Sequence, residues 1–285
     1  MPTLKRRIRF ALATSAAFER AVRTAPGGEE RAWRSARRYV AGRDAGDAIA
    51  VARRLADAGQ RASVDLFGER TEPASAAAVV RAYQDLCARL AAETDAGTWL
   101  SLDASHVAFD AGALDEIAAA VPPGRRLQVG AEEAGVAERV LELVLGAAAA
   151  GRPVEATLQA NLRRSLRDAE RLAAAGVPVR LVKGAYLESS GDAFPWGEDT
   201  DANYVVLARR LQAAGADVAL ATHDRTLREM LLPDVPSARC ELLLGVRPDD
   251  AAALAAAGRD VRIYVPYGAD RFRYFMRRRA EAEGP

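Results

Sequence analysis

Two adjacent arginines near the end of the chain, Arg277 and Arg278, are the side chains with the clearest potential chemistry. The stretch from Asp270 onward is typical of a helix, and a helical period places both arginines and Glu281 on one face. A guanidinium binds a carboxylate through a planar fork, so this face can clamp a small anionic substrate. Taken alone, the charge pattern favours a solvated basic face, so the interpretation depends on the rest of the chain.

Polar side chains also gather where apolar, strand-like runs of the sequence end. In an α/β barrel the carboxyl ends of the strands surround the mouth, where such enzymes place their chemistry. Acids there can simply anchor a turn or begin a helix, and we favour that interpretation for Asp65 and Glu69. The other polar residues at predicted strand ends are Asp103, Ser105, His106, Glu132, Glu133, Thr157, Gln159, Arg180, Lys183, Tyr186, Thr222, His223, Asp224 and Tyr264.

Two further chemistries stay open at these strand ends. Lys183 could form a Schiff base with a carbonyl substrate. Its neighbour Arg180 favours another use, because two cations together suit a phosphate or an anionic cofactor. A metal site is the weaker alternative, because no H-x-H or H-E-x-x-H spacing occurs; its ligands would be Asp103, His106, Glu132 and His223.

The composition is that of a globular protein without a bias toward charged partners. The 285 residues include 40 Lys and Arg against 39 Asp and Glu, and 50% are hydrophobic. This balance argues against a dedicated nucleic-acid binder. Cys87 and Cys240 supply neither a disulfide framework nor a metal-ligand spacing. No apolar run approaches the ~18 residues of a membrane span, so we expect a cytoplasmic protein with at most peripheral membrane contact.

From residue 61 onward, short β-rich runs alternate with helical stretches rich in Ala, Leu and Arg. This alternation predicts parallel strands joined by crossover helices, and the number of units predicts a closed (β/α)8 barrel. An open doubly wound sheet is the alternative, although no G-x-G-x-x-G occurs. The predicted strands are 62–67, 98–105, 126–132, 154–160, 178–184, 218–222, 240–245 and 261–267, and the predicted helices include 74–92, 134–150, 162–175, 201–214 and 249–257.

Two segments lie outside this alternation. Residues 1–60 are typical of helices, and we expect them to pack on a catalytic barrel formed by residues 61–285. The longest polar loop, residues 187–200, follows the fifth predicted strand. It should therefore lie on the side of the barrel where the chemistry is expected.

Several collinear segments resemble the proline dehydrogenase family, whose members use a flavin to oxidise proline to pyrroline-5-carboxylate. The fifth-strand motif of the family is matched by residues 180–186 almost letter for letter. Further segments resemble its first strand from Asp65, its fourth from Thr157 and its sixth from Ala221. The stretch from Tyr264 to Glu281 is similar to its eighth strand and final helix. The likeness runs in the family's order from about Ser35 to the end of the chain.

The resemblance implies a distorted (β/α)8 TIM-type barrel that holds FAD. The implied catalytic residues are Arg180, beside flavin N5, and Tyr264, which would wall the substrate ring together with Tyr186. Arg277 and Arg278 would clamp the substrate carboxylate, braced by Glu281. Leu243 would also contact the substrate, and a quinone is the implied electron acceptor. The implied flavin contacts are Ala131, Gln159, Arg180, Lys183, Gly184, Ala185, Thr222 and His223.

Two positions depart from the family's motifs. Asp103 stands where the second-strand motif has a lysine, and Gly130 stands where the third-strand motif has an aspartate. Asp103 could pair with Arg278 in place of the missing acid, or meet an extra basic group on a substrate such as a hydrazino acid. It could also mark a flavin-binding relative with lost activity. We favour a changed substrate over proline, because an unpaired acid would repel the substrate carboxylate.

We therefore predict an FAD-dependent oxidoreductase acting on a small amino acid, either proline or a proline-like acid. A hydride would pass from the carbon next to nitrogen to flavin N5 and leave an imine. The amine must be neutral to give up a hydride, so activity should rise with pH. The alternatives are a flavin-binding homologue with lost or changed activity, and a Schiff-base lyase using Lys183.

Overall fold

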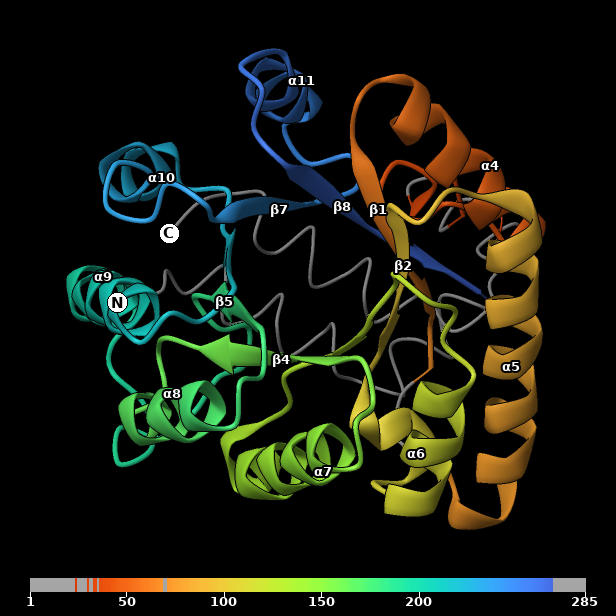
Figure 1. Ribbon diagram of the computed structural model, residues 1–285, viewed down its shortest axis with the longest axis horizontal. Coiled ribbons are helices and arrows are strands. Elements are labelled where there is room, and N and C mark those ends of the chain that lie inside the picture. The colour runs from red at the N-terminus through yellow and green to blue at the C-terminus, as the bar shows by residue number, and fades with distance from the viewer. Residues whose placement is uncertain (1–23, 25–29, 31–32, 35, 69–70, 269–285) are drawn as a thin grey trace.

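The computed structural model describes residues 24, 30, 33–34, 36–68 and 71–268, and these form a closed barrel of parallel strands in the order β1-β2-β3-β4-β5-β6-β7-β8. Each strand pairs in parallel with the next, and β8 closes the barrel on β1. Figure 1 looks into this barrel, with helices surrounding the strands. The strands are β1 Arg61–Leu66, β2 Thr98–Leu102, β3 Leu127–Val129, β4 Val154–Gln159, β5 Val179–Val182, β6 Val218–Ala221, β7 Arg239–Leu243 and β8 Val261–Tyr267.

A ring of α-helices covers the outside of the barrel (Figure 1). Asp110 and Asp224 begin α6 and α10 by accepting bonds from Ala113 N and Leu227 N. The helices are α4 Ala45–Asp57, α5 Ala76–Glu93, α6 Ala111–Ala119, α7 Ala137–Ala149, α8 Ser165–Ala174, α9 Glu198–Ala213, α10 Arg225–Leu231 and α11 Pro248–Ala256, with 3-10 turns η1 Pro73–Ser75, η2 Ala104–Val107 and η3 Ala134–Val136.

The predicted (β/α)8 barrel is confirmed, and its eight strands lie where the sequence predicts them to within a few residues. The second strand is the clearest difference, because it was predicted to reach Ser105 and ends at Leu102. The chain turns there into η2, whose His106 N donates to Asp103 O at 2.9 Å. Helices α6 and α10 are additions to the predicted set.

Helix α4 belongs to the predicted N-terminal helical segment and packs against β1 and β8. Its buried face includes Ala48, Ile49 and Ala52. Its start is fixed by a reciprocal capping box between Asp44 and Asp47. The division of the chain at residue 60 stays a prediction.

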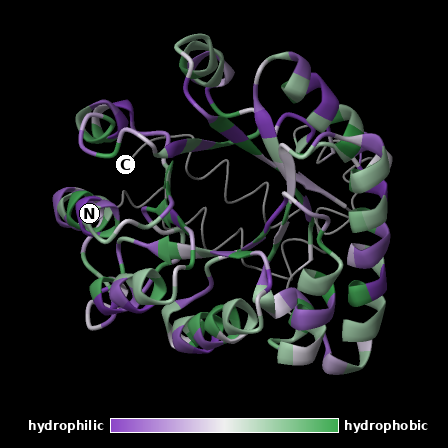
Figure 2. Ribbon diagram, viewed as in Figure 1, coloured by the Kyte–Doolittle hydropathy of each residue, from purple (hydrophilic) through white to green (hydrophobic). Residues whose placement is uncertain are grey.

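The barrel interior is polar, whereas the strand residues facing the helices are apolar. In Figure 2 the strands carry both purple, hydrophilic residues and green, hydrophobic residues along their length. Inward side chains of such barrels stack in layers drawn from alternate strands, with about one residue of stagger per strand. Applied to the observed register, this rule gives three layers. The lower layer holds Trp99, Glu155, Ala219 and Arg262, and the middle layer holds Ser63, Gln128, Arg180 and Glu241. The upper layer, nearest the mouth, holds Ser101, Thr157, Ala221 and Tyr264.

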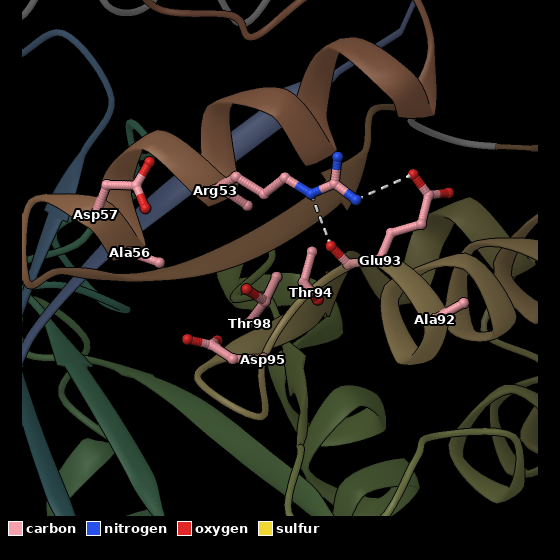
Figure 3. Close-up of a pocket in the computed structure, with 9 residues that line it drawn as sticks. Arg53, Ala56, Asp57, Ala92, Glu93, Thr94, Asp95 and Thr98 are labelled. Carbon is pink, nitrogen blue, oxygen red and sulfur yellow. Dashed lines mark hydrogen bonds and ion pairs between the residues drawn. The ribbon is translucent and has the colours of Figure 1, made fainter.

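A cavity of about 340 Å³ lies between α4 and the end of α5, on the side of the barrel where the strands begin. Figure 3 shows Arg53 of α4 reaching across it, with its Nε donating to Glu93 O at 2.7 Å. Below this end of α5 the buried Arg125 guanidinium donates to Thr94 Oγ1, Thr98 O, Leu90 O and Thr94 O at 2.8–2.9 Å. Arg125 thus ties the final carbonyls of α5 to the start of β2.

Replacement of Arg125 by methionine should lower the free energy of unfolding by about 2–4 kcal/mol, because several buried carbonyls lose a charged donor. Urea unfolding of Arg125→Met measures this change. Arg53→Met is the matched control, since its side chain is 55% exposed and should contribute less than about 1 kcal/mol. Equal losses in the two variants would contradict the role given to Arg125.

Among the described residues, no helix combines the length and the apolar character that crossing a membrane requires.

Candidate active site

The polar strand ends predicted from the sequence do come together around the mouth of the barrel. The residues that lie in strands of the closed sheet, or within three residues of a strand's end, are Asp65, Asp103, Glu132, Gln159, Arg180, Lys183, Thr222, His223 and Tyr264. Four predicted residues lie outside the described part of the chain: Glu69, Arg277, Arg278 and Glu281.

Asp65 of β1 anchors Tyr264 of β8. The Tyr264 hydroxyl donates to Asp65 Oδ2 in a short hydrogen bond, and Tyr83 of α5 donates to Asp65 Oδ1 at 3.0 Å. Asp65 is buried, with 3% exposure. The Tyr264 hydroxyl is thereby directed to the barrel wall, and its ring is fixed at the mouth. Asp65 does more than anchor a turn, so our first interpretation of this residue was wrong.

Asp103 fills the space above Gly130. The two residues follow paired positions of β2 and β3, and Gly130 N donates to Leu102 O at 2.8 Å. A Cβ built on Gly130 would come within 1.8 Å of Asp103 Oδ1. A side chain at position 130 would therefore require the Asp103 carboxylate to move from its present place. The two departures from the family's motifs are structurally complementary.

Glu132 and Gln159 link the ends of β2, β3 and β4. Ser105 N donates to Glu132 Oε1 at 3.0 Å, and Gln159 Nε2 donates to Glu132 O at 2.8 Å. Gln159 is buried, with 4% exposure. Its amide plane is held at the mouth, as a hydrogen-bonding contact to a planar ring requires.

Arg180 is half-buried and held by the neighbouring strand. Its Nε donates to Thr157 Oγ1 at 3.0 Å, and Thr157 belongs to the next layer toward the mouth. This bond directs the guanidinium upward. The fixed cation can stabilise negative charge that develops at the mouth.

Lys183 lies between two carboxylates. Its Nζ is 2.6 Å from Asp201 Oδ1 and 2.8 Å from Asp224 Oδ2. Burial alone would raise the pKa of Asp224, but the bonds from Lys183 and from Leu227 N outweigh it and hold that pKa below its usual range. The Lys183 Nζ is thus engaged by two ion pairs, and this arrangement gives no support to the Schiff-base alternative. A cofactor phosphate would have to share this lysine with both acids.

Thr222 and His223 make local bonds at the end of β6. Thr222 Oγ1 accepts from Asp224 N at 3.1 Å, and Thr222 O accepts from Arg228 Nη1 at 2.7 Å. Leu243 N donates to His223 Nε2 at 3.0 Å, so Nδ1 carries the ring proton. His223 thereby positions the backbone of Leu243, the residue predicted to contact the substrate.

Tyr186, which was predicted to contact the substrate, lies against Ala131, which was predicted to contact the cofactor. The Tyr186 hydroxyl donates to Ala131 O at 3.3 Å. This bond connects the loop after β5 to the end of β3. Glu188 of the same loop adds a second connection, because its Oε1 accepts from Ala134 N at 2.8 Å.

The backbone of residues 183–185 has a conformation that lets another group come very close to it. Gly184 has φ +116°, and a Cβ there would meet Asn161 Oδ1 at 2.0 Å. Asn161 is 1% exposed, yet its Oδ1 and Nδ2 have no hydrogen-bond partner among the described residues. Such an unsatisfied amide beside Arg180 and Lys183 fits a polar ligand that supplies a donor and an acceptor, as a flavin does.

Three contributors were missed from the sequence: the Tyr83 hydroxyl, the Asn161 amide and the Asp201 carboxylate. Asn161 follows Gln159 by two residues, so its place after a predicted strand was the available signal. Tyr83 and Asp201 lie on helices, where nothing in the local pattern distinguishes them.

The structure gives no support to a metal or thiol centre within its described residues. No group of three or more His, Cys, Asp or Glu side chains gathers there in a way that could hold a metal ion. Burial raises the pKa of the Cys87 thiol to about 11 and raises that of Cys240. Neither thiol is therefore poised as a nucleophile.

Comparison with known proteins agrees with this geometry. A sequence profile described as proline dehydrogenase matches residues 48–284. Proline dehydrogenase 1 of Bacillus subtilis is 31% identical over 260 residues, which cover 86% of each chain. A proline dehydrogenase of Deinococcus radiodurans is 39% identical over 139 residues, 45% of this chain and 44% of that one.

Solved structures share the fold. Proline utilization A from Bdellovibrio bacteriovorus, inactivated by N-propargylglycine, superposes with a TM-score of 0.79 at 19% identity over 99% of this chain. Proline utilization A from Bradyrhizobium japonicum gives a TM-score of 0.76 at 21% identity over 94%. The chain spans about a third of these proteins, 36% and 32% of their lengths.

Proposed function

The chain belongs to the proline dehydrogenase family, and from this premise we propose that it is a flavin-dependent oxidoreductase acting on proline. The carbon next to the ring nitrogen would give a hydride to flavin N5, and the nitrogen would lose a proton, leaving a cyclic imine. The observation that carries the proposal is the Arg180 guanidinium, fixed at the mouth by Thr157.

The charges of the mouth suit this chemistry. The cations Arg180 and Lys183 lie in or after β5, whereas the acids Asp65, Asp103 and Glu132 lie in or after β1, β2 and β3. The β5 side therefore suits a cofactor that carries phosphates and gains negative charge on reduction. The flavin, when bound, supplies the hydride chemistry, and the chain orients the reactants.

We assign the substrate carboxylate to Arg277 and Arg278, braced by Glu281. Two guanidinium forks would fix the carboxylate and so limit which face of the substrate ring meets the cofactor. The rings of Tyr264 and Tyr186, with Leu243, would pack around the substrate and exclude water.

For the cofactor we propose FAD, held by Gln159, Arg180, Lys183 and Thr222. Further contacts would come from Gly184, Ala185, His223 and the backbone of Ala131. The unsatisfied Asn161 amide supports a ligand beside Gly184. Release of the cofactor by acid and its mass distinguish FAD from FMN. We further propose a quinone as the electron acceptor, reached through at most peripheral membrane contact.

Product analysis tests the proposal. Flavin-loaded protein, proline and a soluble quinone should yield a product two hydrogens lighter than proline, identified by its mass. The matched control replaces proline by cyclopentanecarboxylate, which keeps the ring and the carboxylate but lacks the nitrogen whose lone pair allows the adjacent carbon to release a hydride. Absence of the imine product from flavin-loaded protein would contradict the proposal.

A second candidate is a proline-like acid with an additional basic nitrogen, such as a hydrazino acid. Asp103 favours it, because this residue adds a carboxylate to the β2 edge of the mouth. A flavin-binding homologue without activity is the remaining alternative. A kcat/KM for hydrazino acids at least tenfold above that for proline would establish the second candidate. A bound flavin that no amine reduces would establish the flavin-binding homologue without activity.

Replacement of Tyr264 by phenylalanine should raise KM several-fold and lower kcat less. The ring stays, but its anchor to Asp65 is lost, which costs about 1–2 kcal/mol. Steady-state kinetics with proline measure both constants. Tyr204→Phe is the control, since the hydroxyl of Tyr204 bonds to Leu181 O on the outer side of the barrel. A fall in kcat with unchanged KM would contradict a purely positioning hydroxyl.

A further inference from the structure

Four charged side chains lie inside the lower barrel, and the proposed reaction uses none of them. Glu155, Arg239, Glu241 and Arg262 are each at most 6% exposed. Their formal charges cancel, but their hydrogen bonds are distributed unequally. This inequality singles out one of the two acids.

Glu155 is fully engaged by guanidinium groups. Arg239 Nη2 lies 3.0 Å from both of its carboxylate oxygens, and Arg126 Nη1 lies 3.3 Å from Oε2. Charge-assisted bonds of this kind stabilise the ionised carboxylate. Glu155 is therefore the better paired of the two acids.

Among the described residues, no guanidinium lies within hydrogen-bond distance of Glu241. The nearest such nitrogens are Arg239 Nε at 3.6 Å and Arg262 Nε at 3.9 Å. Its only described donor is the neutral amide of Gln128, whose Nε2 lies 2.9 and 3.1 Å from the two carboxylate oxygens. The same Nε2 also donates to Glu155 Oε1 at 3.0 Å, so the Gln128 amide bridges the two acids.

The surroundings of Glu241 push its pKa upward. Burial and the neighbouring Glu155 carboxylate raise it, while Arg180, Arg262 and Arg239 oppose them. Every strand contributes an inward neighbour: Ser63, Trp99, Gln128, Glu155, Arg180, Ala219, Ala221, Arg239 and Arg262.

Arg180 connects Glu241 to the active site. The two residues share one layer of the barrel, and only the methyl groups of Ala219 and Ala221 project from the strand between them. Arg180 bonds upward to Thr157. A change of charge at the mouth therefore reaches Glu241 through a low-dielectric interior.

We propose that Glu241 takes up one proton from solvent when the bound flavin is reduced. Reduction adds two electrons and one proton to the flavin, which leaves it with one more negative charge. That charge favours the neutral acid below it, so the carboxylate of Glu241 gains a proton and no other bond changes. The inference rests on the proposed function, because it requires a flavin beside Arg180.

Electrochemical titration of the flavin potential against pH tests this inference without any substrate. Between the pKa of Glu241 in the oxidised protein and its pKa in the reduced protein, reduction takes up one extra proton per two electrons. In this pH window the flavin potential of the wild-type protein should therefore fall more steeply with pH than outside it. Glu241→Gln should lose that extra proton. Ser63→Ala, an uncharged change in the same layer, should keep it. Equal slopes in wild type and Glu241→Gln would overturn the inference.

A second measurement needs no variant. The reduced-minus-oxidised infrared spectrum of the wild-type protein should gain a carboxylic-acid band that shifts on 13C labelling of glutamate. Absence of that band overturns the inference even if Glu241→Gln fails to fold. A flavoprotein that shows the extra proton but does not oxidise proline would overturn only the proposed function. A colourless protein that cannot be reconstituted would overturn both.

Discussion

Gly130→Asp should lower the rate of proline oxidation by about 100-fold and the free energy of unfolding by about 1–3 kcal/mol. The new side chain would enter the space of the Asp103 carboxylate, which lies within 1.8 Å of a Cβ at this position. Two ionised carboxylates repel each other at this distance, so the Asp103 carboxylate must leave the position it holds at the mouth. Stopped-flow reduction of the flavin and urea unfolding measure the two effects.

The double variant Asp103→Gly/Gly130→Asp should recover most of both losses, because one carboxylate again fills the space. Gly135→Asp is the matched control: nothing lies within 4 Å of a Cβ at position 135, so the same chemical change should be tolerated. A double variant as impaired as Gly130→Asp would contradict the complementarity of positions 103 and 130.

Arg180→Met should slow reduction of the flavin by proline by about 10²–10³-fold, the cost of removing a fixed electrostatic donor from a site of developing charge. The methionine retains the apolar stem of the side chain but not its cation. Flavin content should change less than the rate, because most of the proposed cofactor contacts remain. Rapid mixing of proline with the oxidised variant measures the rate.

Two matched variants separate the charge of Arg180 from its orientation. Arg180→Lys keeps the cation and loses the fork that bonds Thr157. Thr157→Val keeps Arg180 and removes the acceptor, and should slow reduction by about tenfold or less. A rate for Arg180→Met equal to that of Thr157→Val would contradict a role for the cation itself.

The barrel was predictable because its signal is local. Alternation of β-rich runs with helical runs fixes the number and order of the strands, and the closed sheet has them in that order. The predicted end of β2 at Ser105 was wrong because its polar residues belong to the turn η2, whose bonds depend on neighbouring strands.

The chemistry of the mouth was predictable only by residue type. Asp103 and Gly130 are complementary because the ends of two neighbouring strands bring them close together in the folded chain. Neither sequence motif contains information about this distance. Glu155 and Glu241 alternate with apolar neighbours, as in a strand with a solvated face. Helices cover that barrel on the outside, so these acids point into the interior, and their bonds appear only in the folded chain.

The most direct test of the account is anaerobic mixing of the FAD-reconstituted wild-type protein with proline. The flavin absorbance band should bleach, and the rate should rise with pH as the amine loses its proton. The same preparation should bleach more slowly, or to a smaller extent, with a hydrazino acid if proline is the substrate. A yellow protein that chemical reductant bleaches and proline leaves unchanged would contradict the account.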